Sequence, residues 1–352
     1  MSTDTQPVFA IVLCDQHHRI SGVSSSCRAL LPFFKRSHRL WFWARQAQDD
    51  VPAQSLHQIF HQLAAEPSTG VIWHARRNNE LLMGIVLRFF SRRRVSVVFT
   101  SAAIRRHSWW PRKLIQAADA VIATSQAAAS FVQPVAAIVP HGVDIERFSH
   151  ALPWAGEAPW RAYSLCIGMI GRIRPEKGSD LMIQALIDTL PSHPNACALM
   201  VGKTTAKYLP LLQAMRQQLQ QAGLSDRVFF LEEVPFSQMP SLYRELDIVA
   251  CPARYEGFGL VPLEAMCSGT AIIASKTGAY PDILEDGVNG ILIDTHNQSA
   301  LSNALARLLA DDQYRIQLQQ QGAQRVGHFS IAHEHQSISK VYQRLMDAQE
   351  QP

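Results

Sequence analysis

The sequence predicts an α/β protein made of two doubly wound, Rossmann-like domains that face each other across a cleft. Three observations support this fold class. Apolar runs of strand length alternate with helical stretches along almost the whole chain, as in strand–helix–strand units. The runs are apolar on both faces, which is typical of buried parallel strands. The chain has 352 residues, more than one core usually holds, and its alternation is interrupted once near the middle.

The first domain is expected over residues 1–150. Its predicted strands are short apolar runs rich in Val, Ile, Phe and Trp. They are Val8–Leu13, Leu40–Trp43, Gly70–Trp73, Val95–Thr100, Ala120–Thr124 and Ala136–Val139.

An aperiodic stretch rich in Pro, Ala and Trp predicts an interdomain linker over 151–163, and the second domain follows over 164–330. Helices are indicated at Leu209–Ala222, which Gly223 ends, and at Ser299–Leu309. Ligands of open α/β sheets bind beyond the carboxyl ends of the strands, so we expect the site between the two domains. The strands predicted here are Ser164–Ile170, Cys197–Val201, Val228–Leu231, Asp247–Cys251, Ala271–Ala274 and Gly290–Ile293.

The composition is that of a soluble globular protein, with 47% hydrophobic and 18% charged residues. A net charge of +4 favours an anionic ligand or surface. A nucleic-acid-binding protein would carry a basic stripe with interleaved aromatic residues, and the densest basic run, RFFSRRR at 88–94, is too short for that. We therefore expect no nucleic-acid partner.

The six cysteines are scattered, without a C-x-x-C pair, and most lie in apolar runs. They indicate reduced core thiols in an intracellular protein. The first residues lack the basic region of a signal peptide, and no apolar run approaches the ~20 residues of a spanning helix. We expect a cytoplasmic protein whose membrane contact, if it has one, is peripheral.

The segment 254–269, RYEGFGLVPLEAMCSG, directly follows the predicted strand Asp247–Cys251. Its glycines free the backbone N–H groups of 257–260 at the start of a helix, where anions bind. Glu256 precedes this anion site, and Glu264 follows it in the first helical turn, where the dipole favours a carboxylate. Carboxylates on both sides of an anion site suit a nucleotide-sugar; the alternative is a surface loop and a capped helix.

A basic pair follows another core strand, in the segment MIGRIRPEKGSD. Arg172 and Lys177 would place fixed positive charge near a helix start, as a diphosphate leaving group requires. Either residue alone would more often be a solvated surface charge. Together with the acid pair in the same domain, they predict a donor phosphate site.

The chain resembles the family-4 retaining glycosyltransferases of the two-domain GT-B fold. The resemblance covers essentially the whole chain and is strongest across 164–295, where the motifs keep the family's order and spacing. The matching segments are VPHGVDIERF (139–148), GRIRPEKG (171–178), EGFGLVPLEAMCSGTAIIAS (256–275) and EDGVNGILI (285–293).

This resemblance implies roles for the residues of the second domain. Glu256 would contact the transferred sugar, Glu264 would hold the ribose, and Arg172 and Lys177 would neutralise the diphosphate. No metal ion or cofactor is implied, and the sequence has no Asp-x-Asp motif; His17 and His18 fit an exposed loop pair better than ligation. The residues expected to supply backbone amides to the donor are Gly257, Phe258, Gly259 and Leu260.

In the first half, Gly22 matches the glycine loop that approaches the donor phosphates in relatives, although a simple helix entry explains it equally well. His74 ends a predicted strand beside two arginines, and relatives often have a histidine beside the sugar here, so we expect a catalytic role. The tail 331–352 would cross back onto the first domain, as in relatives.

Three segments, 73–80, 99–115 and 119–131, resemble the lipopolysaccharide-core mannosyltransferases of Gram-negative bacteria. This implies mannose transfer from GDP-mannose to the Kdo region of a lipid A core, at the cytoplasmic face of the inner membrane. A solvated charged face is the alternative reading of the basic residues here. The residues expected to bind the anionic acceptor are Arg76, Arg77, Arg105 and Arg106.

Two segments have the character of interfacial membrane segments: the apolar stretch 81–94 with its cationic end, and the pair Trp109-Trp110. A core helix followed by a basic turn is the alternative.

Elsewhere the chain departs from the family, with His141 where Asn is commoner, Asp282 where Glu is commoner, and Glu232 where Gly is commoner. The last two lie near the donor in relatives, so a UDP-hexose donor and another envelope glycan stay open. A non-catalytic nucleotide-sugar-binding protein is the rival from another class.

Overall fold

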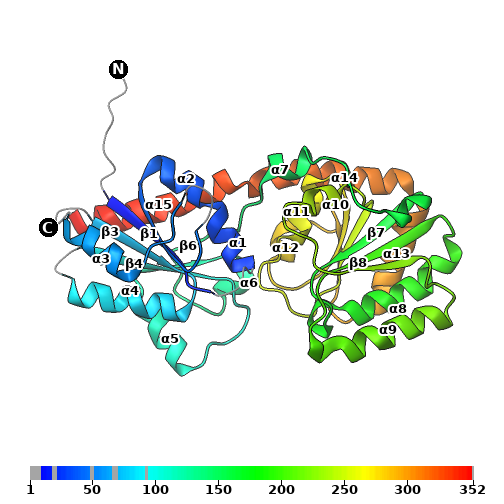
Figure 1. The fold of residues 1–352 in the computed structure, drawn as a ribbon, viewed down its shortest axis with the longest axis horizontal. Coiled ribbons are helices and arrows are strands. Elements are labelled where there is room, and N and C mark those ends of the chain that lie inside the picture. The colour runs from blue at the N-terminus through cyan, green and yellow to red at the C-terminus, as the bar shows by residue number, and fades with distance from the viewer. Residues whose placement is uncertain (1–8, 18–21, 48–50, 66–69, 92–93, 351–352) are drawn as a thin grey trace, which may run out of the picture. The chain divides into compact units, whose positions relative to one another are not determined.

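A computed structural model describes residues 9–17, 22–47, 51–65, 70–91 and 94–350. The chain forms two compact units, each built on one six-stranded sheet (Figure 1). The first unit comprises the chain up to Gly142 together with Ile331 onward, and the second comprises Val143–Ser330.

The sheet of the first unit has the order β2-β1-β3-β4-β5-β6, and all its neighbouring strands are parallel. Every strand predicted for this half is confirmed within two residues at each described end; Val8 lies outside the described residues. The strands are β1 (Phe9–Asp15), β2 (Arg39–Ala44), β3 (Gly70–Ala75), β4 (Val95–Ser101), β5 (Ala120–Ala123) and β6 (Ala137–Ile138).

Helices cover both faces of this sheet, because successive strand residues point to opposite sides. Val12 and Trp73 pack in one core with side chains of α3, α4 and α5, whereas Ile11 and Ile72 pack in another with α1, α2 and α15. The helices are α1 (Gly22–Ala29), α2 (Leu31–Ser37), α3 (Leu56–Ala65), α4 (Asn78–Phe90), α5 (Trp109–Gln116), α6 (Gln126–Ala129) and α15 (Ile331–Glu350).

The sheet of the second unit has the order β12-β11-β10-β7-β8-β9 and is also parallel throughout. All six predicted strands are again confirmed. They are β7 (Leu165–Ile170), β8 (Ala196–Val201), β9 (Val228–Leu231), β10 (Ile248–Cys251), β11 (Ala271–Ser275) and β12 (Ile291–Ile293).

One face of this second sheet packs in a core with α8, α9 and α13, while α11 and α14 contact β11. The predicted helices at Leu209–Ala222 and Ser299–Leu309 are α9 and α13. The helices are α7 (Ile145–Ser149), α8 (Ser179–Thr189), α9 (Leu209–Gln221), α10 (Met239–Tyr243), α11 (Val261–Cys267), α12 (Tyr280–Ile283), α13 (Gln298–Ala310) and α14 (Asp312–Arg325).

The predicted linker 151–163 differs from what the structure shows, because these residues belong to the second unit. Trp160 is only 3% exposed, and its indole N–H donates to Glu245 at 3.2 Å. A buried tryptophan ties this stretch to the sheet, so the boundary between the units falls after Gly142 and not at 150.

The carboxy-terminal helix α15 belongs to the first unit, where the resemblance placed it. The ring of its Tyr342 stacks on Phe34 of α2 with centroids 5.5 Å apart. Among the described residues, no helix is both long enough and apolar enough to cross a bilayer.

Candidate functional site

The donor residues predicted in the second unit lie at the topological switch point of its sheet. Strand β7 has β8 on one side and β10 on the other, so the connections that leave β7 and β10 diverge at their carboxyl ends. Ligands of doubly wound sheets bind in the crevice that such a divergence opens. The loop after β7 carries Arg172 and Lys177, and the loop after β10 carries Glu256.

The structure brings the predicted cation and the predicted acid into contact. The Lys177 ammonium forms an ion pair with the Glu256 carboxylate, and the two side chains are only 17% and 15% exposed. An ammonium group has three N–H donors, so two remain for other oxygens once Glu256 has accepted one. Lys177 can therefore bridge a carboxylate and a phosphate.

Hydrogen bonds hold the two loops together. The backbone N–H groups of Arg254 and Tyr255 donate to the carbonyl of Glu176, at 2.9 and 3.2 Å. The Arg254 guanidinium also forks onto both carboxylate oxygens of Asp180 in the first turn of α8, at 2.6 and 2.7 Å. Burial alone would raise the pKa of Asp180, but the hydrogen bonds and charge of Arg254 outweigh burial and lower that pKa. These contacts fix the position of Lys177 relative to Glu256.

Two glycines let the loops pass this close. Gly178 has a φ of +76°, and a β-carbon there would lie 2.0 Å from the carbonyl oxygen of Pro252. Gly259 has a φ of +73°, and a β-carbon there would lie 2.7 Å from Cγ of Glu256 and 2.9 Å from Oη of Tyr280. Neither position accepts a side chain, so the glycines of both motifs serve the contact between the loops.

Tyr280, at the start of α12, belongs to the site, and the sequence analysis missed it. Its side chain is buried, and a hydrogen bond joins it to Glu256. Burial, the neighbouring Cys251 and Glu256 raise the pKa of its phenol well above the ordinary value. The hydroxyl thus stays protonated and donates to Glu256. The only available signal was an aromatic residue in a segment, 277–287, that departs from the family pattern.

Glu264 lies in the first turn of α11, as the sequence predicted. Its carboxylate accepts a hydrogen bond of 2.6 Å from the hydroxyl of Tyr243. Burial raises the pKa of Glu264, and the hydrogen bond from Tyr243 and the charge of Arg147 reduce the shift. Just before the helix, the N–H groups of Gly259 and Leu260 donate to no backbone carbonyl in the described part of the chain.

Two other predicted donor residues differ in accessibility. Arg172 is exposed directly after β7, and within the described ranges its side chain has no hydrogen bond or ion pair. Phe258 is 5% exposed, so its side chain packs inward and only its backbone is placed to meet a ligand. Gly257, between Glu256 and Phe258, is half-buried. The residues predicted for the donor in this unit therefore share one end of the sheet.

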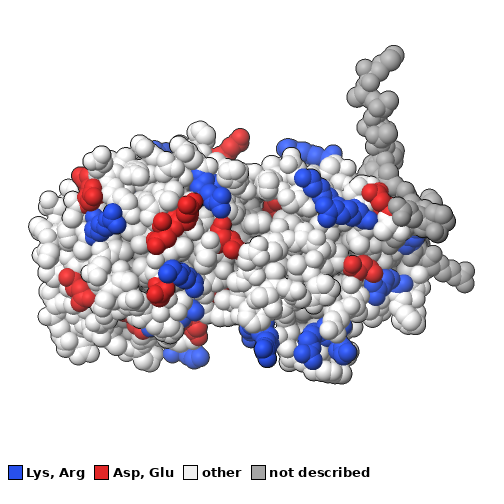
Figure 2. Space-filling model, turned by 180° about the vertical axis from the view of Figure 1, so that it is seen from behind, with Lys and Arg blue, Asp and Glu red and all other residues white. Residues whose placement is uncertain are grey.

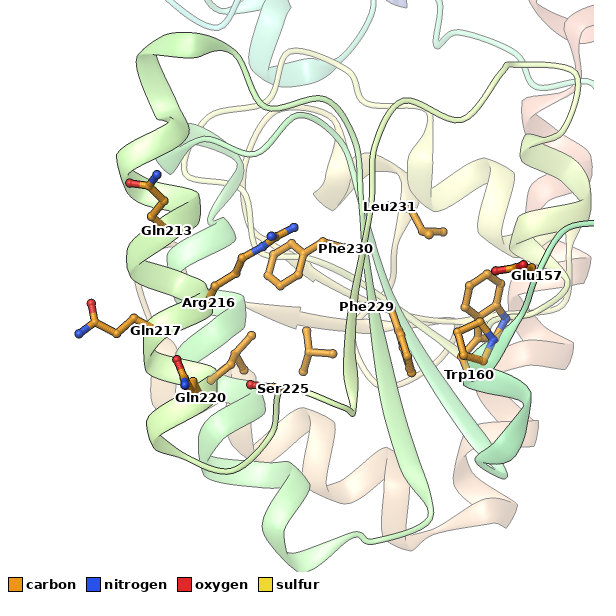
Figure 3. Close-up of a pocket in the computed structure, with 13 residues that line it drawn as sticks. Glu157, Trp160, Gln213, Arg216, Gln217, Gln220, Ser225, Phe229, Phe230 and Leu231 are labelled. Carbon is orange, nitrogen blue, oxygen red and sulfur yellow. The ribbon is translucent and has the colours of Figure 1, made fainter.

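A separate groove of about 720 Å³ lies along the edge strand β9, between α9 and the segment around Trp160 (Figure 3). The Arg216 guanidinium sits 5.2 Å from the centroid of the Phe230 ring, and Trp160 faces Phe229 at 6.1 Å. None of the residues predicted for the donor lines this groove. We do not assign it to the donor site.

In the first unit, two adjacent arginines follow β3, and the second of them is held by buried acids. The Arg77 guanidinium donates to Asp15 and to Glu80, each at 3.0 Å, and these carboxylates are 1% and 0% exposed. It also donates to the hydroxyl of Ser24 at 3.0 Å. The network joins β1, α1 and α4, which gives Arg77 a structural role in addition to the predicted acceptor role.

Arg76 has the opposite environment. Its side chain is buried, yet Nε, Nη1 and Nη2 have no hydrogen-bond partner among the described residues. Burial alone would lower its pKa, but neighbouring groups, chiefly Cys27 and Glu334, raise it, so the guanidinium is charged. A buried, charged guanidinium that makes no hydrogen bond destabilises the fold unless an anion or a water molecule binds it. The sequence predicted the charge but could not predict the burial.

His74 lies within β3 and is fully buried. Its Nδ1 bonds the hydroxyl of Tyr342 at 2.5 Å, and its Nε2 bonds the hydroxyl of Thr100 at 2.7 Å. Burial lowers its pKa, and the charge of Arg76 lowers it further, so the ring is neutral. Nδ1 thus ties α15 to the sheet and Nε2 ties β3 to β4, so both nitrogens are occupied. Contact between His74 and the sugar stays a prediction, and this geometry does not favour it.

The remaining predicted residues of this unit lie on its surface. Gly22 is the exposed first residue of α1. His17 is exposed, and His18 lies outside the described residues. Arg105 and Arg106 are exposed between β4 and α5. His141, where the family more often has Asn, is buried and bonds Glu334 of α15 at 2.9 Å. Within the described ranges, no cluster of three His, Cys, Asp or Glu is placed to hold a metal ion.

Comparison with known proteins identifies the family of these motifs. Residues 159–325 match the model of the glycosyl transferases group 1 domain. The chain is 36% identical to the lipopolysaccharide core biosynthesis mannosyltransferase LpcC of Rhizobium leguminosarum bv. viciae, over 93% of this chain and 94% of that protein. It is 32% identical to the lipopolysaccharide core biosynthesis mannosyltransferase LpsB of Rhizobium meliloti (strain 1021), over 93% and 95%.

The fold is also that of solved glycosyltransferase structures. Anabaena Alr3699/HepE in complex with UDP and glucose superposes with a TM-score of 0.74 at 21% identity, covering 96% of this chain and 100% of that chain. A sucrose-phosphate synthase of Thermosynechococcus elongatus gives a TM-score of 0.75 at 20% identity, covering 97% and 100%. With two parallel six-stranded sheets, the chain has the predicted GT-B fold.

Proposed function

Because the chain belongs to the group 1 glycosyltransferases, we propose that it transfers mannose from GDP-mannose to the anionic inner core of lipopolysaccharide, with retention at the anomeric carbon. The enzyme class follows from the family. The sugar and the acceptor class are proposed from the relatives named for lipopolysaccharide core mannosyl transfer. The acceptor portion is proposed to be the Kdo region, whose carboxylates suit a basic surface.

One observation carries the proposal: the ion pair of Lys177 with Glu256 at the switch point of the second sheet. A donor sugar bound there has a carboxylate beside it and an ammonium beside its diphosphate. Arg172, exposed at the end of β7, adds a second positive charge. Fixed cations placed where negative charge develops lower the barrier to departure of a diphosphate.

The proposed reaction breaks the bond between the anomeric carbon and the diphosphate oxygen and forms a bond from that carbon to the acceptor oxygen on the same face. The acceptor hydroxyl gives its proton to the departing phosphate, whose growing charge Lys177 and Arg172 stabilise. Glu256, held by Lys177 and Tyr280, orients the sugar and stabilises positive charge on the ring. Glu264 holds the ribose hydroxyls. No covalent sugar–enzyme intermediate and no metal ion is part of this proposal.

The acceptor is proposed to meet the basic residues of the first unit. Arg105 and Arg106 are exposed and able to contact carboxylates directly, whereas the guanidinium of Arg76 is buried and has no hydrogen-bond partner among the described residues. The Arg77 guanidinium already forms ion pairs with Asp15 and Glu80. An acceptor embedded in lipid places the enzyme peripherally at the cytoplasmic face of the inner membrane.

A donor screen on the purified protein tests the proposal. Thermal stabilisation by GDP-mannose, UDP-glucose and UDP-galactose is measured without added metal, since a ligand that binds the folded state alone raises stability by RT ln(1 + [L]/Kd). Selective stabilisation by GDP-mannose supports it. Selective response to a UDP-sugar overturns the donor but keeps the class, and no response to any donor overturns the transferase role of the site.

A second experiment tests acceptor and stereochemistry. Kdo-bearing lipid A and GDP-mannose are incubated with the enzyme, and the anomeric proton of the product is examined by NMR. An α-linked mannose, which has the configuration of the donor, is the expected product. A β-linked product would overturn retention, and transfer only to acceptors without Kdo would overturn the acceptor.

A further inference from the structure

Helix α4 of the first unit presents an apolar stripe to solvent. Leu82 and Val86 are 39% and 38% exposed, and at the end of the helix Phe89 and Phe90 are 81% and 79% exposed. The spacing of these residues, four then three or four, places them along one side of a helix. The two phenylalanine rings contact each other edge to face, with centroids 5.2 Å apart.

The same helix already has a buried apolar side. Leu81 and Leu87 are buried in the core, and Gly84 lies against the Trp73 ring so closely that a β-carbon there would be 2.3 Å from it. Packing on the sheet therefore accounts for this inner side alone. The outer stripe of α4 is not needed for the core.

A second exposed aromatic pair lies on the neighbouring helix. Trp109 and Trp110, at the start of α5, are 64% and 53% exposed, with rings 5.9 Å apart. Helices α4 and α5 contact each other in the first unit, as Figure 1 also shows. We call the outer stripe of α4 with the start of α5 the aromatic face: Leu82, Val86, Phe89, Phe90, Trp109 and Trp110.

The segment that carries the aromatic face is rich in basic residues. From 81 to 118, between Glu80 and Asp119, the sequence has eight Arg and Lys residues and no Asp or Glu. Figure 2 shows Lys and Arg side chains along the lower edge of this unit, where α5 lies in Figure 1. The described exposed cations of this stretch are Arg94, Arg105, Arg106, Arg112 and Lys113.

We propose that the aromatic face of α4 and α5 is a docking surface for an anionic phospholipid bilayer, with the surrounding cations on the lipid phosphates. Exposed Trp and Phe rings partition into the boundary between headgroups and acyl chains, and each basic side chain near an anionic membrane adds further affinity. A protein partner would not need so basic a segment around the exposed aromatic residues. The inference deepens the proposed function, on which it rests for the identity of the membrane.

The test is co-sedimentation of the full chain with vesicles, without donor or acceptor. Vesicles of phosphatidylcholine are compared with vesicles of phosphatidylcholine mixed with phosphatidylglycerol, at low and at high salt. We expect binding to the anionic vesicles, weakened by salt because exposed charges are screened. Tryptophan fluorescence should shift to the blue on binding, as the exposed indoles leave water.

Two variants separate the apolar and the basic contributions. Phe89→Ser with Phe90→Ser, and separately Arg112→Gln with Lys113→Gln, should each weaken binding to anionic vesicles at least about tenfold, since one basic residue contributes roughly fivefold. The matched controls lie on the same unit outside the face: Phe60→Ser on α3, 42% exposed, and Lys35→Gln with Arg36→Gln on α2. The controls should bind as the parent does.

Three outcomes would overturn the proposal: no binding to anionic vesicles, equal binding to both vesicle types, or equal losses in the variants and their controls. Thermal stabilisation by GDP-mannose is measured on the same preparations. A protein that binds the donor but no vesicles refutes the docking surface and leaves the transferase proposal standing. Vesicle binding without any donor response refutes the transferase proposal alone.

Discussion

The ammonium of Lys177 and the carboxylate of Glu256 meet although 79 positions separate them in the chain. One arrives from the loop after β7 and the other from the loop after β10, and these strands are neighbours at the switch point of the sheet. The contact joins the residue proposed to hold the diphosphate to the residue proposed to hold the sugar. The donor's bond to be broken would lie between them.

Removing either partner should strongly reduce transfer while the fold persists. We expect Lys177→Ala and Glu256→Ala each to lower kcat/KM about 10²–10³-fold, the usual cost of removing a group that stabilises transition-state charge. The measurement is mannose transfer under saturating acceptor, with unfolding monitored by circular dichroism to show that each variant unfolds cooperatively.

The matched control for this pair is Lys276→Ala. Lys276 also forms an ion pair in the second unit, with Asp294 at 2.9 Å, but it is 49% exposed and is not one of the predicted donor residues. Its loss should leave transfer unchanged. Near-parental turnover in Lys177→Ala or Glu256→Ala would remove the role assigned to that residue.

Arg254 should act as a positioning residue for this pair. Arg254→Lys keeps the charge but loses the fork on Asp180, so the loop after β10 is less firmly fixed to α8. We expect the Kd of GDP-mannose to rise about tenfold and kcat to fall by a similar factor, because misplacing catalytic groups is costly even without changing them. Binding is measured by calorimetry and kcat by transfer.

Arg161 offers a comparison of the same geometry away from the site. It forks onto Glu245 with two contacts of 2.7 Å. Arg161→Lys should leave both donor affinity and kcat unchanged. If the two variants altered stability alike and neither altered donor affinity, Arg254 would be a structural residue without a positioning role.

The strands could be predicted because a buried parallel strand is apolar on both faces, so a short run of sequence is enough to identify it. Val228–Leu231 is found with the predicted bounds. The boundary between the units could not be predicted, because the burial of Trp160 depends on a contact with Glu245, 85 positions away. Composition identified the stretch as irregular, and irregular segments can still pack on a domain.

The chemical groups of the site could be predicted from the sequence, but the contacts between them could not. The sequence predicts Glu256 and Lys177 as an acid and a cation at strand ends. Their ion pair could be predicted only from the order of the strands in the sheet, which the sequence does not show. His74 was judged by its neighbours in sequence, but Tyr342 and Thr100, which occupy its nitrogens, come from elsewhere in the chain. Tyr280 was missed because only its packing against Glu256 and Gly259 marks it.

Donor affinity should depend on pH through Glu264. Burial raises its pKa, so its carboxyl group protonates at higher pH than an ordinary glutamate. A protonated carboxyl accepts fewer hydrogen bonds from ribose hydroxyls, so the Kd of GDP-mannose should rise as pH falls through this raised pKa. Glu264→Gln should bind more weakly at neutral pH and show a flat profile. A parental profile in Glu264→Gln would assign the pH dependence to another group.

The raised pKa of Glu264 also determines how this residue changes the free energy of unfolding with pH. A carboxyl group whose pKa is higher in the folded than in the unfolded protein favours folding when protonated. Its contribution is present below the ordinary pKa of about 4.3 and is lost as pH rises through the folded value. In the parent this falling contribution opposes the gain of stability that ordinary carboxylates give as pH rises. The free energy of unfolding should therefore rise more steeply with pH in Glu264→Gln than in the parent, between the ordinary and the raised pKa of Glu264. The two proteins are compared by urea denaturation across that range.

The same substitution should change the stability of the protein by very different amounts at the adjacent residues Arg76 and Arg77. Arg77→Met leaves Asp15 paired with Arg28 but removes the ion pair of the buried Glu80, so the free energy of unfolding should fall by about 3–5 kcal/mol. Arg76→Met removes a buried charge that makes no hydrogen bond in the described structure, and with it the desolvation cost of that charge. Its unfolding free energy should change by less than about 1 kcal/mol.

Because the Arg76 guanidinium is proposed to bind an acceptor anion, Arg76→Met should nevertheless raise the acceptor KM about tenfold or more, the effect of losing a charge-assisted contact. Urea denaturation and transfer kinetics on both variants decide the matter: a large loss of stability in Arg76→Met with unchanged KM would make Arg76 a structural cation satisfied by buried water.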